Sequence, residues 1–237
     1  MSKRRGSATA AAGTLEYLVN AWRNAKGLFN YKDVDAPLKA ALADAGFYGA
    51  LRIFVVAGIL AFVITAAMNL ETAYLANFMI ETLKEATGEV RQLVSFDSLL
   101  PVVFLNFLLI IPFGIAYEIA SSAVAFSLLH LTGGKGTPGA HFQLSSTVSL
   151  AYSMAMVLAF FAPLPCVQLL AAIALFVAGI YLLVYVLAKA YVAVHGVSLG
   201  HALIIAAFML LGRAVVMTLV SNALSSIVGL VPLSLGV

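Results

Sequence analysis

Two charged residues lie deep inside long apolar runs of this chain of 237 residues: Glu118 and Arg213. A charge at the centre of a membrane helix costs about 2.5–3.5 kcal/mol, so such a residue is a candidate functional group. Glu118 could carry protons or ions along a transport path. Alternatively, the two charges form a salt bridge between helices, because Glu118 lies thirteen residues before Leu131 and Arg213 twelve after His201. This matched depth favours the salt bridge.

A glycine-rich loop after the second apolar run invites comparison with phosphate-binding loops. It contains Gly133, Gly134, Lys135 and Gly136. A Walker A loop needs Gly-Lys-Ser/Thr after four intervening residues, between a strand and a helix, and this loop lacks that order. We interpret it as a turn whose lysine lies on the cytoplasmic side, with a lipid-headgroup contact as the alternative.

All four histidines are expected at helix ends on one side of the membrane: His130, His141, His195 and His201. Clustered imidazoles could bind a metal or sense pH. Histidines also suit helix C-termini and interfaces. No carboxylate lies near them in the sequence, so the second interpretation is favoured and no metal site is expected.

The sequence contains none of the common catalytic motifs. His-Glu-x-x-His, Gly-x-Ser-x-Gly and Gly-x-Gly-x-x-Gly do not occur. The single cysteine, Cys166, excludes an internal disulfide and a cysteine metal cluster. We therefore expect no enzymatic activity and no cofactor.

The composition is that of a membrane protein. Hydrophobic residues make up 63% of the chain and charged residues 10%, with a mean hydropathy of +1.05. Soluble domains carry about 25% charged residues. The net charge of +3 arises from basic residues that crowd the first fifty positions, which is no signal for nucleic acid. The predicted fold class is all-α, a polytopic membrane protein with five transmembrane helices.

The second span is expected to be long and kinked, with the other spans packed around it. Its apolar run, Leu99–Leu131, would extend roughly 50 Å as a helix, whereas a bilayer core is about 30 Å thick. Pro112 is the expected kink site. The preceding loop, Glu71–Ser98, is expected to hold a separate short amphipathic helix, and Pro163 and Pro165 to turn the chain between spans three and four. The five expected spans are about Phe47–Asn69, Leu99–Leu131, Leu144–Phe161, Cys166–Ala188 and Ala202–Leu230.

Residues 1–45 form a basic tail before the membrane domain of residues 46–237. Apolar residues recur at helical spacing over Thr14–Asn30, which predicts an amphipathic helix with Trp22 as an interfacial anchor. The alternative is a helix packed on the protein's own cytoplasmic face. Asp35 is expected to cap a second short helix that has Pro37 in its first turn.

Basic residues set the expected topology. Ten lie in segments that are cytoplasmic if the N-terminus is inside, and only Lys84 and Arg91 lie on the other side. The positive-inside rule therefore predicts a cytoplasmic N-terminus and an outside C-terminus. Two inside loops, Thr132–His141 and Val194–His201, are then expected to lie close together. The ten are Lys3, Arg4, Arg5, Arg23, Lys26, Lys32, Lys39, Arg52, Lys135 and Lys189.

Three segments together resemble the Yip1 domain family of multi-pass membrane proteins: Leu18–Phe29, His130–Thr137 and Val194–Ala202, which includes His195 and Gly196. Eukaryotic members of that family carry a longer cytosolic N-terminal region and are implicated in vesicle traffic and Rab GTPase binding. This chain has only about 45 residues before its first span. The resemblance therefore implies a prokaryotic relative in the cell membrane, for which Rab binding is not expected.

These observations predict a non-enzymatic protein with a membrane-organising or partner-binding role. The alternative is a small transporter or channel component that uses Glu118. A water-filled cavity reaching Glu118 would favour the alternative, and a sealed bundle would not. The expected partners are the lipid bilayer, a membrane or peripheral protein, and a second copy of the chain.

Overall fold

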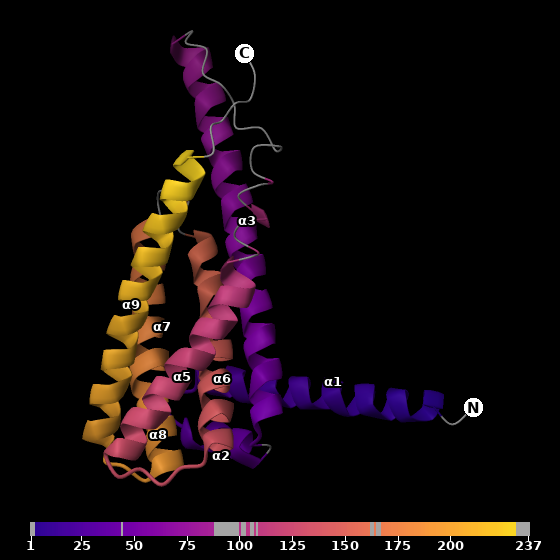
Figure 1. The fold of residues 1–237 in the computed structure, drawn as a ribbon. Coiled ribbons are helices and arrows are strands. Elements are labelled where there is room, and N and C mark those ends of the chain that lie inside the picture. The colour runs from indigo at the N-terminus through magenta and orange to yellow at the C-terminus, as the bar shows by residue number, and fades with distance from the viewer. Residues whose placement is uncertain are drawn as a thin grey trace.

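The computed structural model describes residues 3–43, 45–87, 100, 103–104, 107, 109–161, 164 and 167–230. This described part is all-α, as predicted, and five of its helical segments are long and apolar enough to cross a membrane. Figure 1 shows these long segments running alongside one another as a bundle. The architecture is that of an integral multi-pass membrane protein. The five segments are Phe47–Thr82, Ile111–Leu131, Pro138–Phe161, Gln168–His195 and Leu199–Val220.

Two helices precede the bundle. Helix α1 (Lys3–Gly27) lies across the long helices near one end of the bundle instead of along them (Figure 1). Helix α2 (Asp35–Ala43) then turns back under the bundle. The predicted cap was wrong: the Asp33 carboxylate accepts the Ala36 N–H at 3.1 Å, whereas Asp35 forms an ion pair with Lys189 at 3.6 Å. Asp33 precedes the first helical turn, where a carboxylate can reach the free N–H groups.

The first span is part of a single helix of 41 residues, α3 (Phe47–Thr87). The expected separate helix within Glu71–Ser98 is therefore wrong for the residues up to Thr87. No glycine or proline lies between Asn69 and Thr87, so nothing in the sequence ends the helix there. Its uncharged stretch between Arg52 and Glu71 rises about 28 Å, close to the thickness of a bilayer core.

The regular α-helix of the second span is interrupted at the residue where the sequence predicts a kink. Pro112 lies inside a π-helical turn, η1 (Leu109–Phe113), which leads into α5 (Gly114–Leu131). Proline has no N–H to donate, so the regular helical ladder is interrupted at this point. Of the predicted residues before Leu109, the structure describes only positions 100, 103, 104 and 107.

The third span begins earlier than predicted. Helix α6 (Pro138–Ala155) is continued by a 3-10 segment, η2 (Met156–Phe161). Thr137 caps α6, since its hydroxyl oxygen accepts the Ala140 N–H at 3.4 Å, and Pro138 occupies the first turn. His141 is therefore a helix residue and not part of the preceding loop.

The last two spans are joined by a short turn. The fourth consists of α7 (Gln168–Ile180), a π-helical segment η3 (Tyr181–Val186) and α8 (Leu187–His195). Gly196 ends α8 in the left-handed conformation, at φ +66°, and α9 (Leu199–Leu230) follows. Cys166 and the predicted hairpin prolines Pro163 and Pro165 lie outside the described residues.

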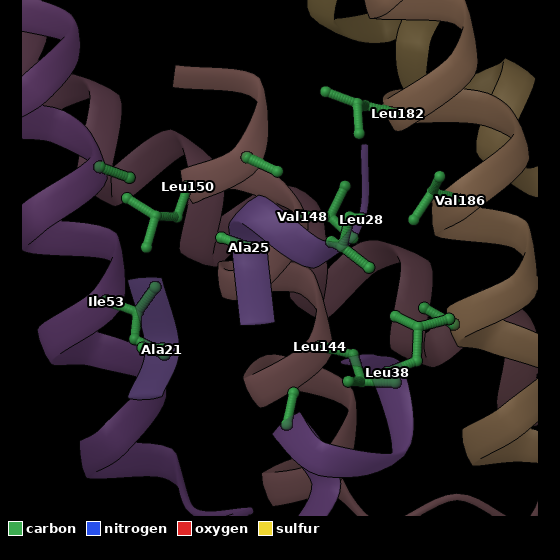
Figure 2. Close-up of a cluster of buried hydrophobic side chains, with 14 of the residues drawn as sticks. Ala21, Ala25, Leu28, Leu38, Ile53, Leu144, Val148, Leu150, Leu182 and Val186 are labelled. Carbon is green, nitrogen blue, oxygen red and sulfur yellow. The ribbon is translucent and has the colours of Figure 1, made fainter. Parts of the chain in front are cut away.

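The bundle is centred on α6, and not on the second span as expected. In the most apolar stretch of the α6 span 61% of residues are buried, against 11% to 22% in the other four spans. Small residues such as Ser146 and Ala151 let neighbouring helices approach closely. Figure 2 shows how Leu144, Val148 and Leu150 of α6 meet side chains from several elements. Their partners in this core include Leu28, Leu38, Ile53, Leu182 and Val186.

Candidate functional site

The two intramembrane charges form an ion pair between α5 and α9. Arg213 Nη2 contacts Glu118 Oε1, and the Ser149 hydroxyl of α6 donates to Glu118 Oε2 at 2.8 Å. The guanidinium carbon of Arg213 also lies 5.2 Å from the centre of the Tyr152 ring, within the range of a cation–π contact. Each charge therefore has an opposite charge and a second polar or aromatic partner.

A small cavity, lined by both polar and apolar side chains, adjoins this ion pair. Its volume of about 40 Å³ exceeds the roughly 10–15 Å³ that one water molecule needs, so a few waters fit. The Ser145 hydroxyl, on the cavity wall, is buried without a hydrogen-bond partner. Water is the simplest group that would satisfy it. The lining residues are Tyr117, Glu118, Ser121, Ser122, Ser145, Val148, Ser149, Leu183, Leu187, Tyr191, Met209, Leu210 and Arg213.

The cavity follows a polar stripe on α6. His141, Ser145, Ser149 and Ser153 recur every four residues, which places them on one face of the helix, and all four are buried. Ser145 and Ser149 line the cavity. His141 lies one turn closer to the loops.

His141 pairs with His195, one turn below the cavity. His141 Nδ1 lies 3.0 Å from His195 Nε2, and His141 Nε2 lies 2.9 Å from the Ser122 carbonyl oxygen. A carbonyl only accepts, so His141 carries its hydrogen on Nε2, and His195 must donate from its own Nε2. His195 Nδ1 then offers a lone pair, and this buried atom has no partner.

Aromatic rings enclose the two imidazoles. The Tyr191 ring stacks on His141 at 5.3 Å, and the Phe126 ring lies 5.5 Å from His141 and 5.6 Å from His195. Phe126 also stacks on His130 at 5.8 Å. We call His141, His195, Phe126 and His130 the histidine layer. Three of the four histidines are thus brought together, and His201 is exposed outside the layer.

The two loops meet beneath this layer, as the sequence predicts. The Lys135 N–H donates to the His195 carbonyl oxygen at 3.1 Å. A side chain at Gly136 would lie 2.8 Å from His195 Nδ1 and one at Gly134 would lie 2.9 Å from His195 Cβ, so only glycine allows this approach. Gly133 adopts φ +93°, a conformation that favours glycine.

The packing of the loop against His195 accounts for its glycines, so no bound phosphate is needed to explain them. The N–H groups of Gly133 and Gly134 donate to the carbonyls of His130 and Leu129, which end α5. These amides are therefore already used, and the loop forms no open phosphate cradle. In the described part of the chain no group of three or more His, Cys, Asp or Glu residues could hold a metal ion.

The predicted interfacial anchor lies on a partly docked helix. Trp22 is 46% exposed, whereas Ala21, Ala25 and Leu28 are buried against the bundle. The Tyr17 hydroxyl donates to Gln143 Oε1 of α6 at 2.9 Å. One face of α1 thus packs on the protein, as the second interpretation expects, and the face that carries Trp22 is exposed.

Several residues of the site were missed from the sequence. Ser149, Ser145 and Tyr191 were not predicted, and neither was the His141–His195 contact. The four-residue repeat from His141 to Ser153 was a signal that could have indicated a polar, inward-facing stripe. Comparison with protein-family models, with curated proteins and with solved structures gave no match.

Proposed function

We propose that this chain is a non-enzymatic membrane-organising protein of the Yip1 type, in a prokaryotic cell membrane with its N-terminus cytoplasmic. The observation that carries the proposal is the placement of α1. This helix lies across the bundle, is docked by one face, and exposes a second, apolar face (Figure 1).

Three faces of α1 have different characters. Ala21, Ala25 and Leu28 pack on the bundle. A second face exposes the apolar stripe, which we define as Leu15, Val19 and Trp22, at 65%, 48% and 46% exposure. A third face carries Glu16, Asn20 and Arg23. An apolar stripe beside a polar face, on a helix with flanking cations, suits the boundary between headgroups and acyl chains.

The level of α1 along the bundle supports the same placement. Arg52 of α3 donates to the Thr14 hydroxyl at 3.4 Å. Arg52 also begins the uncharged stretch of α3 that matches the bilayer core. With that stretch in the hydrocarbon, α1 lies at its edge, in the headgroup layer. The apolar stripe then inserts into one leaflet beside the bundle and favours curved bilayers.

The test is reconstitution in liposomes of defined lipid composition. Wild type is expected to give smaller, more curved vesicles by cryo-electron microscopy than a Leu15→Ser/Val19→Ser/Trp22→Ser variant. A polar-face variant, Glu16→Gln/Arg23→Gln, is the matched control and should behave as wild type. Equal vesicle sizes for all three proteins would contradict the proposal.

A second candidate function is a transporter or channel component, and one specific observation favours it. The cavity reaches Glu118, as a transport path would require. Ser149 lies six residues beyond Gln143, the residue that contacts α1, so the ion pair is only about 9 Å further into the bundle than α1. A short path from the cytoplasmic side would reach it.

A further inference from the structure

We propose that the histidine layer is a proton-sensitive gate between the loops and the Glu118 cavity. The inference deepens the second candidate function and rests on it. The gate is closed while His141 is neutral, and it opens when both His141 and His195 carry an extra proton.

The layer lies directly below the cavity on three helices. On α6, His141 is one turn from Ser145; on α8, His195 is one turn from Tyr191; and on α5, Phe126 is one turn from Ser122. Ser122, Ser145 and Tyr191 all line the cavity. The layer therefore stands between the cavity and the loop glycines Gly134 and Gly136.

The contacts of His141 connect the layer to the cavity wall. Its Nε2–H holds the Ser122 carbonyl at 2.9 Å, and its ring stacks on Tyr191. Movement of His141 would release two residues of the wall together. The Ser122 carbonyl cannot pass a proton onward, so the histidines act as a closure and not as a relay.

The closed state depends on a shared hydrogen bond that needs a neutral His141, whereas His195 can donate this bond with or without an extra proton. His141 Nδ1 accepts from His195 Nε2 only while it keeps its lone pair. Double protonation would set two donors and two positive charges 3.0 Å apart. A proton on His195 Nδ1 would also find no acceptor, because that atom faces Gly134 and Gly136 without a partner.

The surrounding groups do not offset such charges. The titratable groups around the pair are His130 of α5 and Tyr191 of α8, and the Lys135 backbone contacts His195 from the loop. The charged groups of the layer above, Glu118 and Arg213, are paired with each other. Among the described residues neither imidazole of the pair contacts a carboxylate. Acidification therefore adds positive charge that nothing nearby neutralises.

The test is cysteine accessibility in membrane vesicles. Ser145→Cys, in a Cys166→Ala background, reports on the cavity, and Ser198→Cys in the exposed turn before α9 reports on the loop face. A charged, membrane-impermeant thiosulfonate is added on the loop face at about pH 4 and about pH 8, because a buried imidazole gains its proton at a lower pH than a free one. The rate for Ser145→Cys is divided by that for Ser198→Cys, which corrects for thiolate formation and for vesicle orientation.

The normalised rate is expected to be about tenfold higher at the lower pH. Repulsion between two unit charges about 3 Å apart would shift the equilibrium from closed to open by about this factor, even in a water-like dielectric. His195→Gln, whose amide can still donate to His141 Nδ1, should stay slow at both pH values. His201→Gln, outside the layer, should keep the response. Equal normalised rates at both pH values, or a response that survives His195→Gln, would overturn the gate. If Ser145→Cys never reacts while Ser198→Cys does, the cavity is closed to that face and the second candidate function fails with it.

Discussion

Arg213 of α9 and Glu118 of α5 form an ion pair between two spans, and the hydroxyl of Ser149 on α6 donates a hydrogen bond to the same carboxylate. Three spans are joined by this one group of residues. Each charge alone would be costly to place in hydrocarbon, and pairing the two offsets part of that cost. The pair therefore determines which faces of α5 and α9 turn toward α6.

Loss of one partner should destabilise the protein more than loss of both. We expect Glu118→Gln and Arg213→Met each to cost about 2.5–3.5 kcal/mol, since each leaves an uncompensated charge or dipole in the bundle. The double variant should lose less stability than the sum of the losses of the two single variants. Thermal unfolding in mild detergent measures the cycle. Additive losses would show that the contact contributes no coupling.

The sequence predicted the spans and this ion pair better than the ends and centre of the bundle. The spans can be recognised from local hydropathy, because a bilayer requires long apolar runs. The matched depth of Glu118 and Arg213 follows from helix rise alone. Helix ends depend on individual caps, such as Thr137 for α6 and Asp33 for α2, which are easily displaced by a few residues. The central position of α6 and the His141–His195 contact depend on which helix faces meet. A single sequence does not state that.

Gly136→Ala should destabilise the loop beneath the histidine layer. Its added Cβ would lie 2.5 Å from Val194 Cγ1 and 2.8 Å from His195 Nδ1, a degree of overpacking that costs about 1–3 kcal/mol. Thermal stability in detergent should fall accordingly. Gly139→Ala is the matched control, because its nearest new contact would be 3.7 Å, and it should be neutral or slightly stabilising. Equal behaviour of the two variants would contradict the packing described for the loop.

Gly49→Ala should undock α1. The new Cβ would lie 2.3 Å from the Tyr17 hydroxyl, which binds Gln143, so that contact cannot persist. Trypsin should then cleave faster at Arg23. Tyr17→Phe removes the hydroxyl, which is the closest clash, and leaves only the ring Cζ at 2.8 Å, so combining it with Gly49→Ala should restore part of the protection. Unchanged cleavage in Gly49→Ala would mean that this contact does not hold α1.

The predicted topology can be tested with two cysteines in a Cys166→Ala background. Thr82→Cys, in the exposed far part of α3, should react with an impermeant thiol reagent from outside the cell. Thr137→Cys, at the start of α6, should react only after the membrane is opened. The reverse pattern would place the N-terminus outside.

The depth of Trp22 tests the central claim, that α1 lies in the headgroup layer, most directly. Trp22 is the only tryptophan of the chain, so intrinsic tryptophan fluorescence reports on α1 alone. In proteoliposomes containing brominated lipids, we expect strong quenching by bromine placed near the headgroups, weaker quenching by bromine near the bilayer centre, and little quenching by aqueous iodide. Strong iodide quenching with no effect of either brominated lipid would place Trp22 in water and contradict the account.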